Sequence, residues 1–154
     1  MDDIAYHILY NEDYPGWLYA VNLGATTIWE RWNSLLENGT ISNLKMNSFN
    51  HYAYGSVCEA IYSRIAGLRN LSPGWKKVKI QPHINYRIKM MDFSYDSISG
   101  KFEIKWKCKE NKFFLNVTIP NGVEAEIILP NNEKSYLKGG QFNFICNLNK
   151  NIYS

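Results

Sequence analysis

The residue types best suited to chemistry lie in the stretch "ATTIWERW", which places Glu30 between Trp29 and Trp32. A carboxylate can take up a proton during catalysis, and flat indole rings can support the face of a sugar. An ordinary role is also open, because a glutamate in the first turns of a helix is most often solvated and a helical tryptophan is most often core. This stretch therefore supplies candidates for catalysis or sugar binding without choosing between them.

His51 is the second candidate for chemistry. It lies in "SFNHYAYG", among polar and aromatic residues near a predicted helix start, where an imidazole can donate a hydrogen bond to a hydroxyl group. A lone histidine is more often structural, so His51 needs support from its surroundings.

The composition is that of a folded globular protein. The chain has 154 residues, of which 45% are apolar and 20% are charged, and this length corresponds to one domain or two small ones. The net charge of +3 is small and the basic residues are scattered, so we expect no nucleic-acid partner. Five Trp and eleven Tyr raise the aromatic share to 15%, which suits sugar binding, a core or an interface.

The cysteines and the N-terminus bear on location and cofactors. Cys58, Cys108 and Cys146 are odd in number and widely spaced, which fits neither a disulfide framework nor a zinc site with paired ligands. The opening "MDDIAYHILY" has neither the basic start of a signal peptide nor the length of a membrane span. We therefore expect a cytoplasmic protein with reduced thiols, no metal, no cofactor and no membrane partner.

Helical patterns occupy the first part of the chain. "TTIWERWNSLLENG", residues 26–39, has apolar residues at helical spacing and ends at Gly39, which predicts a helix that carries Glu30 near its N-terminus. "FNHYAYGSVCEAIYSRIAGL" predicts a second helix that ends at Gly67. "DDIAYHILY" predicts a third, shorter one. So few helices can each bury only one face, and they need a partner surface.

The pattern changes near "LRNLSPGW", where Asn, Ser, Pro and Gly cluster and apolar residues begin to alternate. "KFEIKWKCKE" alternates as a half-buried strand does, and turn signals, among them Asn121-Gly122 and Gly139-Gly140, separate further short runs. We therefore predict an α+β fold with a helical segment at 1–70 and an antiparallel β-sandwich at 71–154.

A family resemblance extends these patterns. "YPGWLYAVNLGATTIWERWNSLLENG" and "MNSFNHYAYGSVCEAIYSRIAGL" closely resemble the final helices of the catalytic domain of bacterial α-L-rhamnosidases, which are inverting glycoside hydrolases with an (α/α)6 barrel. "PGWKKVKIQP" and "VTIPNGVEAEIILP" resemble the sandwich domain that follows that barrel. The resemblance implies N-terminal helices from an incomplete (α/α)6 barrel followed by an antiparallel β-sandwich.

The resemblance also implies roles for individual residues. Glu30 matches the family's general base, which removes a proton from the water that attacks the anomeric carbon, and His51 matches a histidine that binds the rhamnose. Trp29 and Trp32 are expected around Glu30 as packing or pocket wall. An inverting enzyme needs this base roughly 6.5 to 9.5 Å from an acid partner, which leaves room for water.

The family's general acid comes from barrel segments well upstream, and we expect no counterpart in this chain. A base without its acid gives little turnover, so we expect the chain alone to be inactive. Its partners would be a rhamnoside-type carbohydrate and either an upstream chain that complements it or a second copy that binds through the helical half. The alternative is a non-catalytic carbohydrate-binding module, or one that serves only for self-association.

Overall fold

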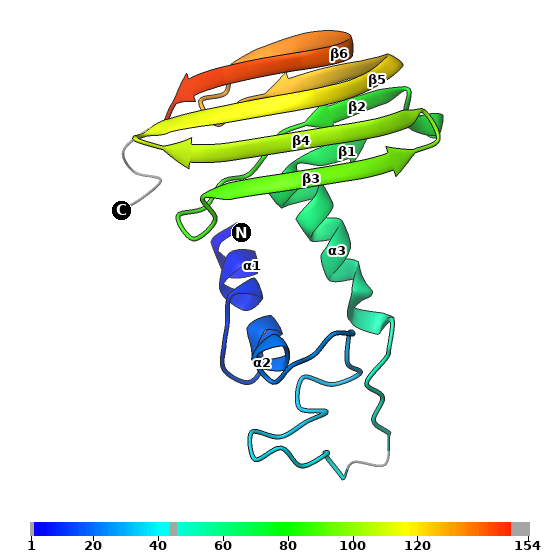
Figure 1. Ribbon diagram of the computed structural model, residues 1–154, viewed down its shortest axis with the longest axis vertical. Coiled ribbons are helices and arrows are strands. Elements are labelled where there is room, and N and C mark those ends of the chain that lie inside the picture. The colour runs from blue at the N-terminus through cyan, green and yellow to red at the C-terminus, as the bar shows by residue number, and fades with distance from the viewer. Residues whose placement is uncertain (1, 44–45, 149–154) are drawn as a thin grey trace. The chain divides into compact units, whose positions relative to one another are not determined.

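The computed structural model describes residues 2–43 and 46–148, and the chain divides into two compact units, one ending at Glu59 and the other beginning at Ala60 (Figure 1). Short helices and irregular segments make up the first unit, and strands make up most of the second. The predicted α+β class is confirmed. The domain limits of 1–70 and 71–154 stay a prediction.

Two short helices open the first unit. α1 covers Asp2–Leu9, where the sequence predicts a helix, and α2 covers Trp17–Asn22. Helices of 8 and 6 residues are too short to be stable by themselves, so their stability depends on packing. Tyr6 of α1 and Tyr19 of α2 are the buried residues that supply it.

The predicted helix over residues 26–39 is wrong, because this segment is irregular. Backbone bonds around Glu30 lead out of the segment: the Glu30 N–H donates to the Ser48 carbonyl and the Ile28 carbonyl accepts from the His51 N–H, both at 2.8 Å. Threonine, isoleucine and tryptophan are weak helix formers, so these distant partners outweigh the helical spacing of the apolar residues.

The second predicted helix is confirmed, although its geometry changes along its length. A 3₁₀ turn, η1 (Ala53–Ser56), is followed by α3 (Val57–Ala60) and by η2 (Ile61–Ala66), which is π-helical. It ends as predicted at Gly67, whose φ of 85° is left-handed. A Cβ at this position would lie 2.4 Å from the backbone of Gln81, so only glycine fits.

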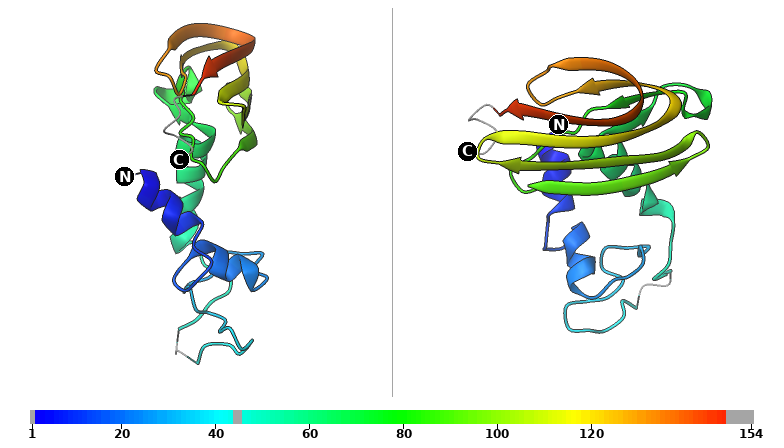
Figure 2. Two further views of the ribbon diagram at one scale, coloured as in Figure 1. Left: turned by 90° about the vertical axis from the view of Figure 1, so that its left-hand side faces the viewer. Right: turned by 45° about the horizontal axis from the view of Figure 1, so that its top comes forward.

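The second unit is a single six-stranded sheet that curls on itself (Figures 1 and 2). The strand order is β1-β2-β5-β4-β3, and β6 pairs with β5. The strands are β1 (Leu68–Asn70), β2 (Lys77–Ile80), β3 (Met90–Ser97), β4 (Gly100–Lys109), β5 (Lys112–Ile128) and β6 (Lys134–Asn147). Pairing among these strands is antiparallel, as predicted, except that β2 and β5 are parallel, so the sheet is mixed. A short 3₁₀ turn, η3 (Pro73–Trp75), precedes β2.

A bend in the long β5–β6 hairpin produces the curl. The register shifts between Ile119 and Glu124, and β5 changes its second partner there. Before the bend β5 pairs with β4 as far as Thr118, and after it residues 124–127 pair with β2. The two ends of the sheet therefore extend from different halves of one strand.

The turn signals at Asn121-Gly122 and Gly139-Gly140 lie at this bend. Gly140 pairs with Ile119 at the register shift, and a Cβ on Gly139 would lie 2.7 Å from the Cα of Asn121. The two signals mark a bend that two paired strands share, and the expectation that each of them ends a strand is wrong.

The apolar core of this unit follows the predicted alternation. In β4 the side chains of Phe102, Ile104 and Trp106 are buried while Lys105 and Lys107 are exposed. β2 and β5 contribute alternate residues to the same core: Val78, Ile80, Phe113, Leu115, Val117, Ile119, Ala125 and Ile127. The Trp106 indole N–H donates to the Ile65 carbonyl at 2.9 Å, which joins β4 to η2.

Candidate functional site

The candidate base and the candidate sugar ligand lie on neighbouring segments of the first unit. The Glu30 N–H bonds to Ser48 and the His51 N–H bonds to Ile28, so the two segments run in opposite directions side by side. The Thr27 hydroxyl adds a third bond to the Phe49 carbonyl. Residues that are far apart in the sequence are thus brought together by backbone hydrogen bonds.

Glu30 occupies a different setting from the one predicted. It lies in an irregular segment, so no helix N-terminus favours its charge, and its own N–H is engaged by the Ser48 carbonyl. Its side chain is half-buried. Arg31, which follows Glu30 in the sequence, donates from Nε to the Met46 carbonyl at 2.9 Å. Glu30 is therefore held by its backbone, and the residue stays partly open to solvent.

His51 lies two residues before η1, close to a helix start as predicted. Its Nδ1 accepts a hydrogen bond of 3.2 Å from the Ala53 N–H, the first amide of η1, which has no partner within a helix. A ring nitrogen that accepts carries no proton, so the proton of the neutral imidazole is on Nε2. His51 can therefore donate from Nε2 to an acceptor such as a sugar oxygen.

The two tryptophans beside Glu30 differ in their surroundings. Trp29 is only 8% exposed and meets Phe49 edge to face with ring centroids 5.2 Å apart, which is a core position. Trp32 is half-buried and stacks on Tyr54 at 5.3 Å. It also meets Trp17 edge to face at 4.8 Å.

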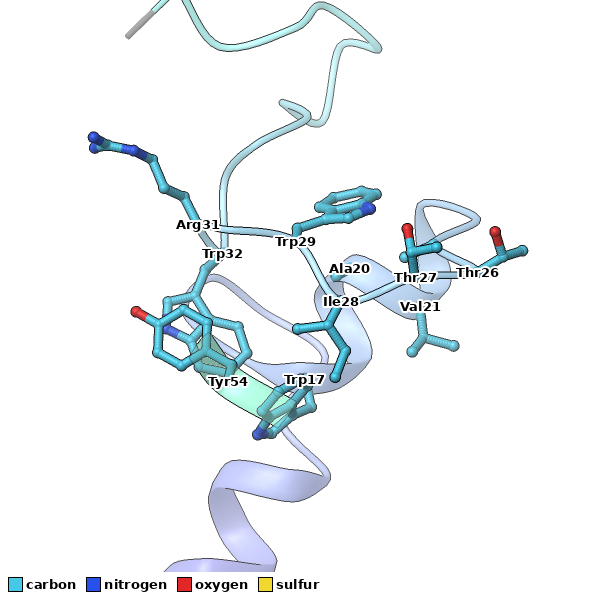
Figure 3. Close-up of a pocket in the computed structure, with 11 residues that line it drawn as sticks. Trp17, Ala20, Val21, Thr26, Thr27, Ile28, Trp29, Arg31, Trp32 and Tyr54 are labelled. Atoms are coloured by element: carbon cyan, nitrogen blue, oxygen red, sulfur yellow. The ribbon is translucent and has the colours of Figure 1, made fainter. Parts of the chain in front are cut away.

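An aromatic cleft of about 260 Å³ lies beside this cluster (Figure 3). Its lining is mainly apolar and comes from α2, the 25–32 segment and η1: Trp17, Ala20, Val21, Ala25, Thr26, Thr27, Ile28, Trp29, Arg31, Trp32 and Tyr54. The rings of Trp17, Trp32 and Tyr54 gather on one side, and the Arg31 side chain points away from them. Neither Glu30 nor His51 lines it.

Trp17 and Tyr54 were not predicted as site residues. Tyr54 lies within the second predicted helix, where an aromatic residue has no distinguishing pattern, and Trp17 follows Pro15 and Gly16, where no periodic pattern points to a role. The one available signal is the aromatic composition, which does not say which rings meet.

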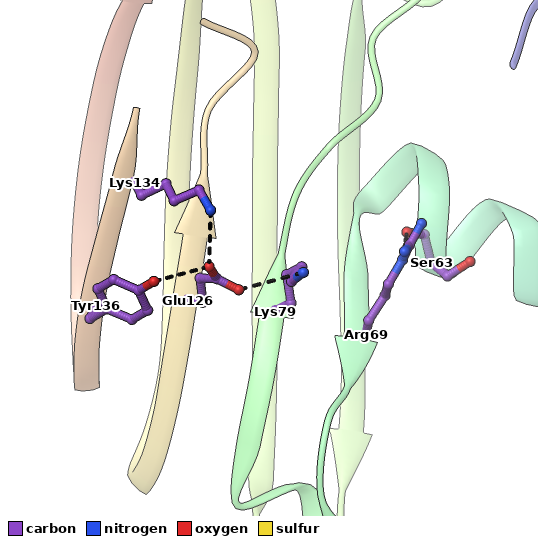
Figure 4. Close-up of polar contacts among 6 residues, drawn as sticks. All are labelled: Ser63, Arg69, Lys79, Glu126, Lys134 and Tyr136. Carbon is purple, nitrogen blue, oxygen red and sulfur yellow. Dashed lines mark hydrogen bonds and ion pairs between the residues drawn. The ribbon is translucent and has the colours of Figure 1, made fainter. Parts of the chain in front are cut away.

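Paired charges cover part of the outer face of the second unit (Figure 4). The Glu126 carboxylate lies 3.5 Å from Nζ of Lys79 and 3.7 Å from Nζ of Lys134. The Tyr136 hydroxyl donates to the same carboxylate at 3.2 Å. In the same view, the Arg69 side chain donates from Nε to the Ser63 carbonyl at 3.2 Å.

Glu124 repeats this arrangement in the neighbouring row. The hydrogen bond and charge of Lys138, followed by those of Lys77, lower the pKa of the Glu124 carboxyl below its usual value. A groove of about 450 Å³ lies among these residues. The charges that border it neutralise one another, so we assign it no ligand.

The described part of the chain holds no cluster of three or more His, Cys, Asp or Glu able to bind a metal ion. Within residues 2–43 and 46–148, no helix has the length and apolar character needed to cross a membrane.

Comparison with protein families accounts for nearly all of the chain. Residues 1–65 match the bacterial alpha-L-rhamnosidase 6 hairpin glycosidase domain, and residues 67–142 match the bacterial alpha-L-rhamnosidase C-terminal domain. The chain belongs to the bacterial α-L-rhamnosidase family.

Individual α-L-rhamnosidases show the same relationship. The chain is 39% identical to an alpha-L-rhamnosidase of Formosa agariphila over 142 residues, which is 92% of this chain and 15% of the relative. A solved α-L-rhamnosidase from Aspergillus terreus matches with a TM-score of 0.87 and 33% identity, over 91% of this chain and 17% of that one. The α-L-rhamnosidase of Streptomyces avermitilis, solved in complex with L-rhamnose, also gives a TM-score of 0.87, with 29% identity over 94% of this chain and 16% of that one. The chain therefore spans about a sixth of the length of these α-L-rhamnosidases.

Proposed function

We propose that this chain contributes the general base and part of the sugar site to the hydrolysis of terminal α-L-rhamnosyl glycosides with inversion. Glu30 removes a proton from the attacking water, and His51 donates from Nε2 to a rhamnose oxygen. The observation that supports this pairing is the pair of 2.8 Å backbone bonds that joins the Glu30 segment to the His51 segment. Trp29 packs behind Glu30, and Trp32 forms part of the wall of the sugar pocket next to Glu30.

Inversion also requires an acid that protonates the leaving group while the base activates water. We propose that barrel segments outside this chain supply that acid, so that the chain alone is inactive. Restoring those segments as a separate chain should restore turnover, because acid and base act on one transition state. The first unit would then associate with an upstream chain or, without one, with a second copy of itself.

Hydrolysis of an aryl α-L-rhamnoside tests this proposal. We expect no turnover by the chain alone and turnover in its mixture with an upstream barrel chain. Glu30→Gln should reduce the turnover of the mixture by a factor of about 10² or more, because general base catalysis is lost. Glu37→Gln is the matched control, since Glu37 is an exposed glutamate of the same irregular region.

Two outcomes would contradict the proposal. If Glu30→Gln retains the activity of the mixture, Glu30 is not the base. If the chain alone hydrolyses the substrate as fast as an intact relative, the acid lies within it, and Asp13→Asn and Glu59→Gln would identify which carboxyl acts.

The aromatic cleft favours a second candidate function, namely sugar binding without catalysis. Its rings from Trp17, Trp32 and Tyr54 suit the apolar face of a sugar. An NMR titration with L-rhamnose and other monosaccharides, observed at the side chains of Trp29, Trp32 and His51, distinguishes the two. A binding module would bind after Glu30→Gln and lose binding after Trp32→Ala, which removes a ring that lines the cleft, without contributing to any hydrolysis.

Self-association and location are further parts of the proposal. We expect a homo-oligomer through the helical unit in the absence of an upstream chain, and light scattering that shows a monomer at tens of micromolar would contradict it. We also propose a cytoplasmic location, because the described cysteines, Cys58, Cys108 and Cys146, form no disulfide, as is usual in a reducing compartment; cell fractionation tests this.

A further inference from the structure

Tyr52 is an unusual surface residue of the first unit. Its side chain is 90% exposed, although tyrosine carries a large apolar ring. The ring lies parallel to that of His51, with an interplanar angle of 4° and centroids 5.5 Å apart. One face of Tyr52 is therefore directed to the imidazole, and the other is open.

The orientation of His51 fixes where a sugar can bind next to it. The Ala53 N–H donates to Nδ1, so the free donor of the ring is the Nε2–H group. The N–H bond at Nε2 lies in the plane of the imidazole ring. A rhamnose that accepts from Nε2 lies off the edge of the imidazole and not over its face.

The open face of Tyr52 points in a different direction. Because the two rings are parallel, this face looks along the normal to the imidazole plane, at right angles to the Nε2–H bond. A single pyranose cannot both accept from Nε2 and cover the far face of Tyr52. Two successive rings of one ligand can do so, since stacking on an aromatic face needs only a flat apolar surface.

We propose that Tyr52 binds the group attached to the rhamnose, so that its open face forms a subsite for the adjoining sugar or aromatic ring of the glycoside. This inference rests on the proposed function, which places rhamnose at His51. Tyr52 is then a residue that determines specificity for the leaving group, while His51 recognises the rhamnose itself.

Binding of two ligands to the full chain tests this subsite. L-Rhamnose has only the first ring, and phenyl α-L-rhamnoside adds an aromatic ring at the position of the leaving group. We expect the wild-type chain to bind the phenyl glycoside about fivefold more tightly, which is typical of one aromatic contact. Tyr52→Ala should abolish this difference and leave the affinity for L-rhamnose unchanged, and Tyr52→Phe should retain it.

Tyr136→Ala is the matched control, because Tyr136 is also a highly exposed tyrosine, 74%, but belongs to the sheet. It should leave the affinity ratio at its wild-type value. An unchanged ratio in Tyr52→Ala, or an equal loss for both ligands, would overturn the subsite while the proposed function stands. Failure of the wild-type chain to bind either ligand would overturn both the subsite and the proposed function. His51→Ala should weaken the binding of both ligands, which shows that they bind where proposed.

Discussion

Each of the two units of the chain is stabilised by a different kind of interaction. In the sheet unit, whole rows of side chains such as Phe102, Phe113 and Leu115 are completely buried. Among the described residues of the first unit, the buried apolar side chains are the aromatic residues Tyr6, Tyr19 and Trp29. Half-exposed ring contacts, such as that of Trp32 with Tyr54, and hydrogen bonds between irregular segments supply further order. Stability is thus concentrated in the sheet, whereas the candidate chemistry lies on the weaker scaffold.

The largest effect should come from the core of the sheet. Phe113 is 0% exposed, and Phe113→Ala removes a whole ring from a well-packed site, so we expect the free energy of unfolding of the sheet unit to fall by about 3 to 5 kcal/mol. Urea denaturation followed by the near-ultraviolet circular dichroism of the aromatic residues measures it.

Ile145→Ala on the same sheet is the control, since Ile145 is 62% exposed and should change the free energy by only about 0.5 kcal/mol. If Phe113→Ala cost no more than Ile145→Ala, the sheet would not be the stable part of the molecule.

A smaller effect is expected in the first unit. The hydroxyl of Tyr19, which is buried, donates to the Leu35 carbonyl at 3.2 Å and ties α2 to the irregular region. Tyr19→Phe keeps the ring and removes this bond, so we expect the first unit to lose about 0.5 to 1.5 kcal/mol. Amide hydrogen exchange, resolved by NMR, should show faster exchange near Leu35 and unchanged protection in β4 and β5.

Tyr14→Phe provides the comparison, because Tyr14 is 55% exposed. Equal acceleration in both units after Tyr19→Phe would show that they unfold as one, and the contrast between them would be lost.

The smallest effect should be a dependence of sheet stability on pH. Lys138 and Lys77 lower the folded-state pKa of Glu124 below its unfolded value, so this carboxylate stabilises the sheet above the unfolded pKa and ceases to do so as the pH falls through the folded pKa. Thermal unfolding of wild type between about pH 5 and pH 3 should show a decline that Glu124→Gln reduces.

Glu133→Gln removes the same charge at the exposed turn after β5 and serves as the control. An identical decline in the wild type and in Glu124→Gln would show that the lysine pairs at Glu124 contribute nothing to the sheet.

Local signals in the sequence predicted the elements whose bonds are local. The end of the helix at Gly67 and the alternation of β4 were both predicted, because left-handed glycine and a two-residue period act over a few residues. The helix at 26–39 was predicted wrongly, since its backbone groups bond to residues 48–51, which spacing cannot reveal. The predicted strand ends at Gly122 and Gly140 were also wrong, because these glycines lie at a bend that the paired strands β5 and β6 share, and spacing cannot reveal that pairing.

The candidate site shows the same limit. The family resemblance selected Glu30 and His51, but the backbone bonds that make their segments neighbours could not be foreseen from spacing. The ring of Tyr54 and that of Trp17 were missed because an aromatic cluster depends on which segments meet. These contacts are decided by tertiary structure.

The parallel pairing of β2 with β5 has a consequence for synthesis of the chain. Residues 77–80 are made early in the sheet unit, but their partners at 124–127 come only after β3 and β4. During translation, Val78 and Ile80 therefore stay without their neighbours on β5 until that strand leaves the ribosome. Such a high contact order makes folding slow and leaves apolar surface open to aggregation in the meantime. A nascent chain halted before residue 124 would need a chaperone more than the finished protein does.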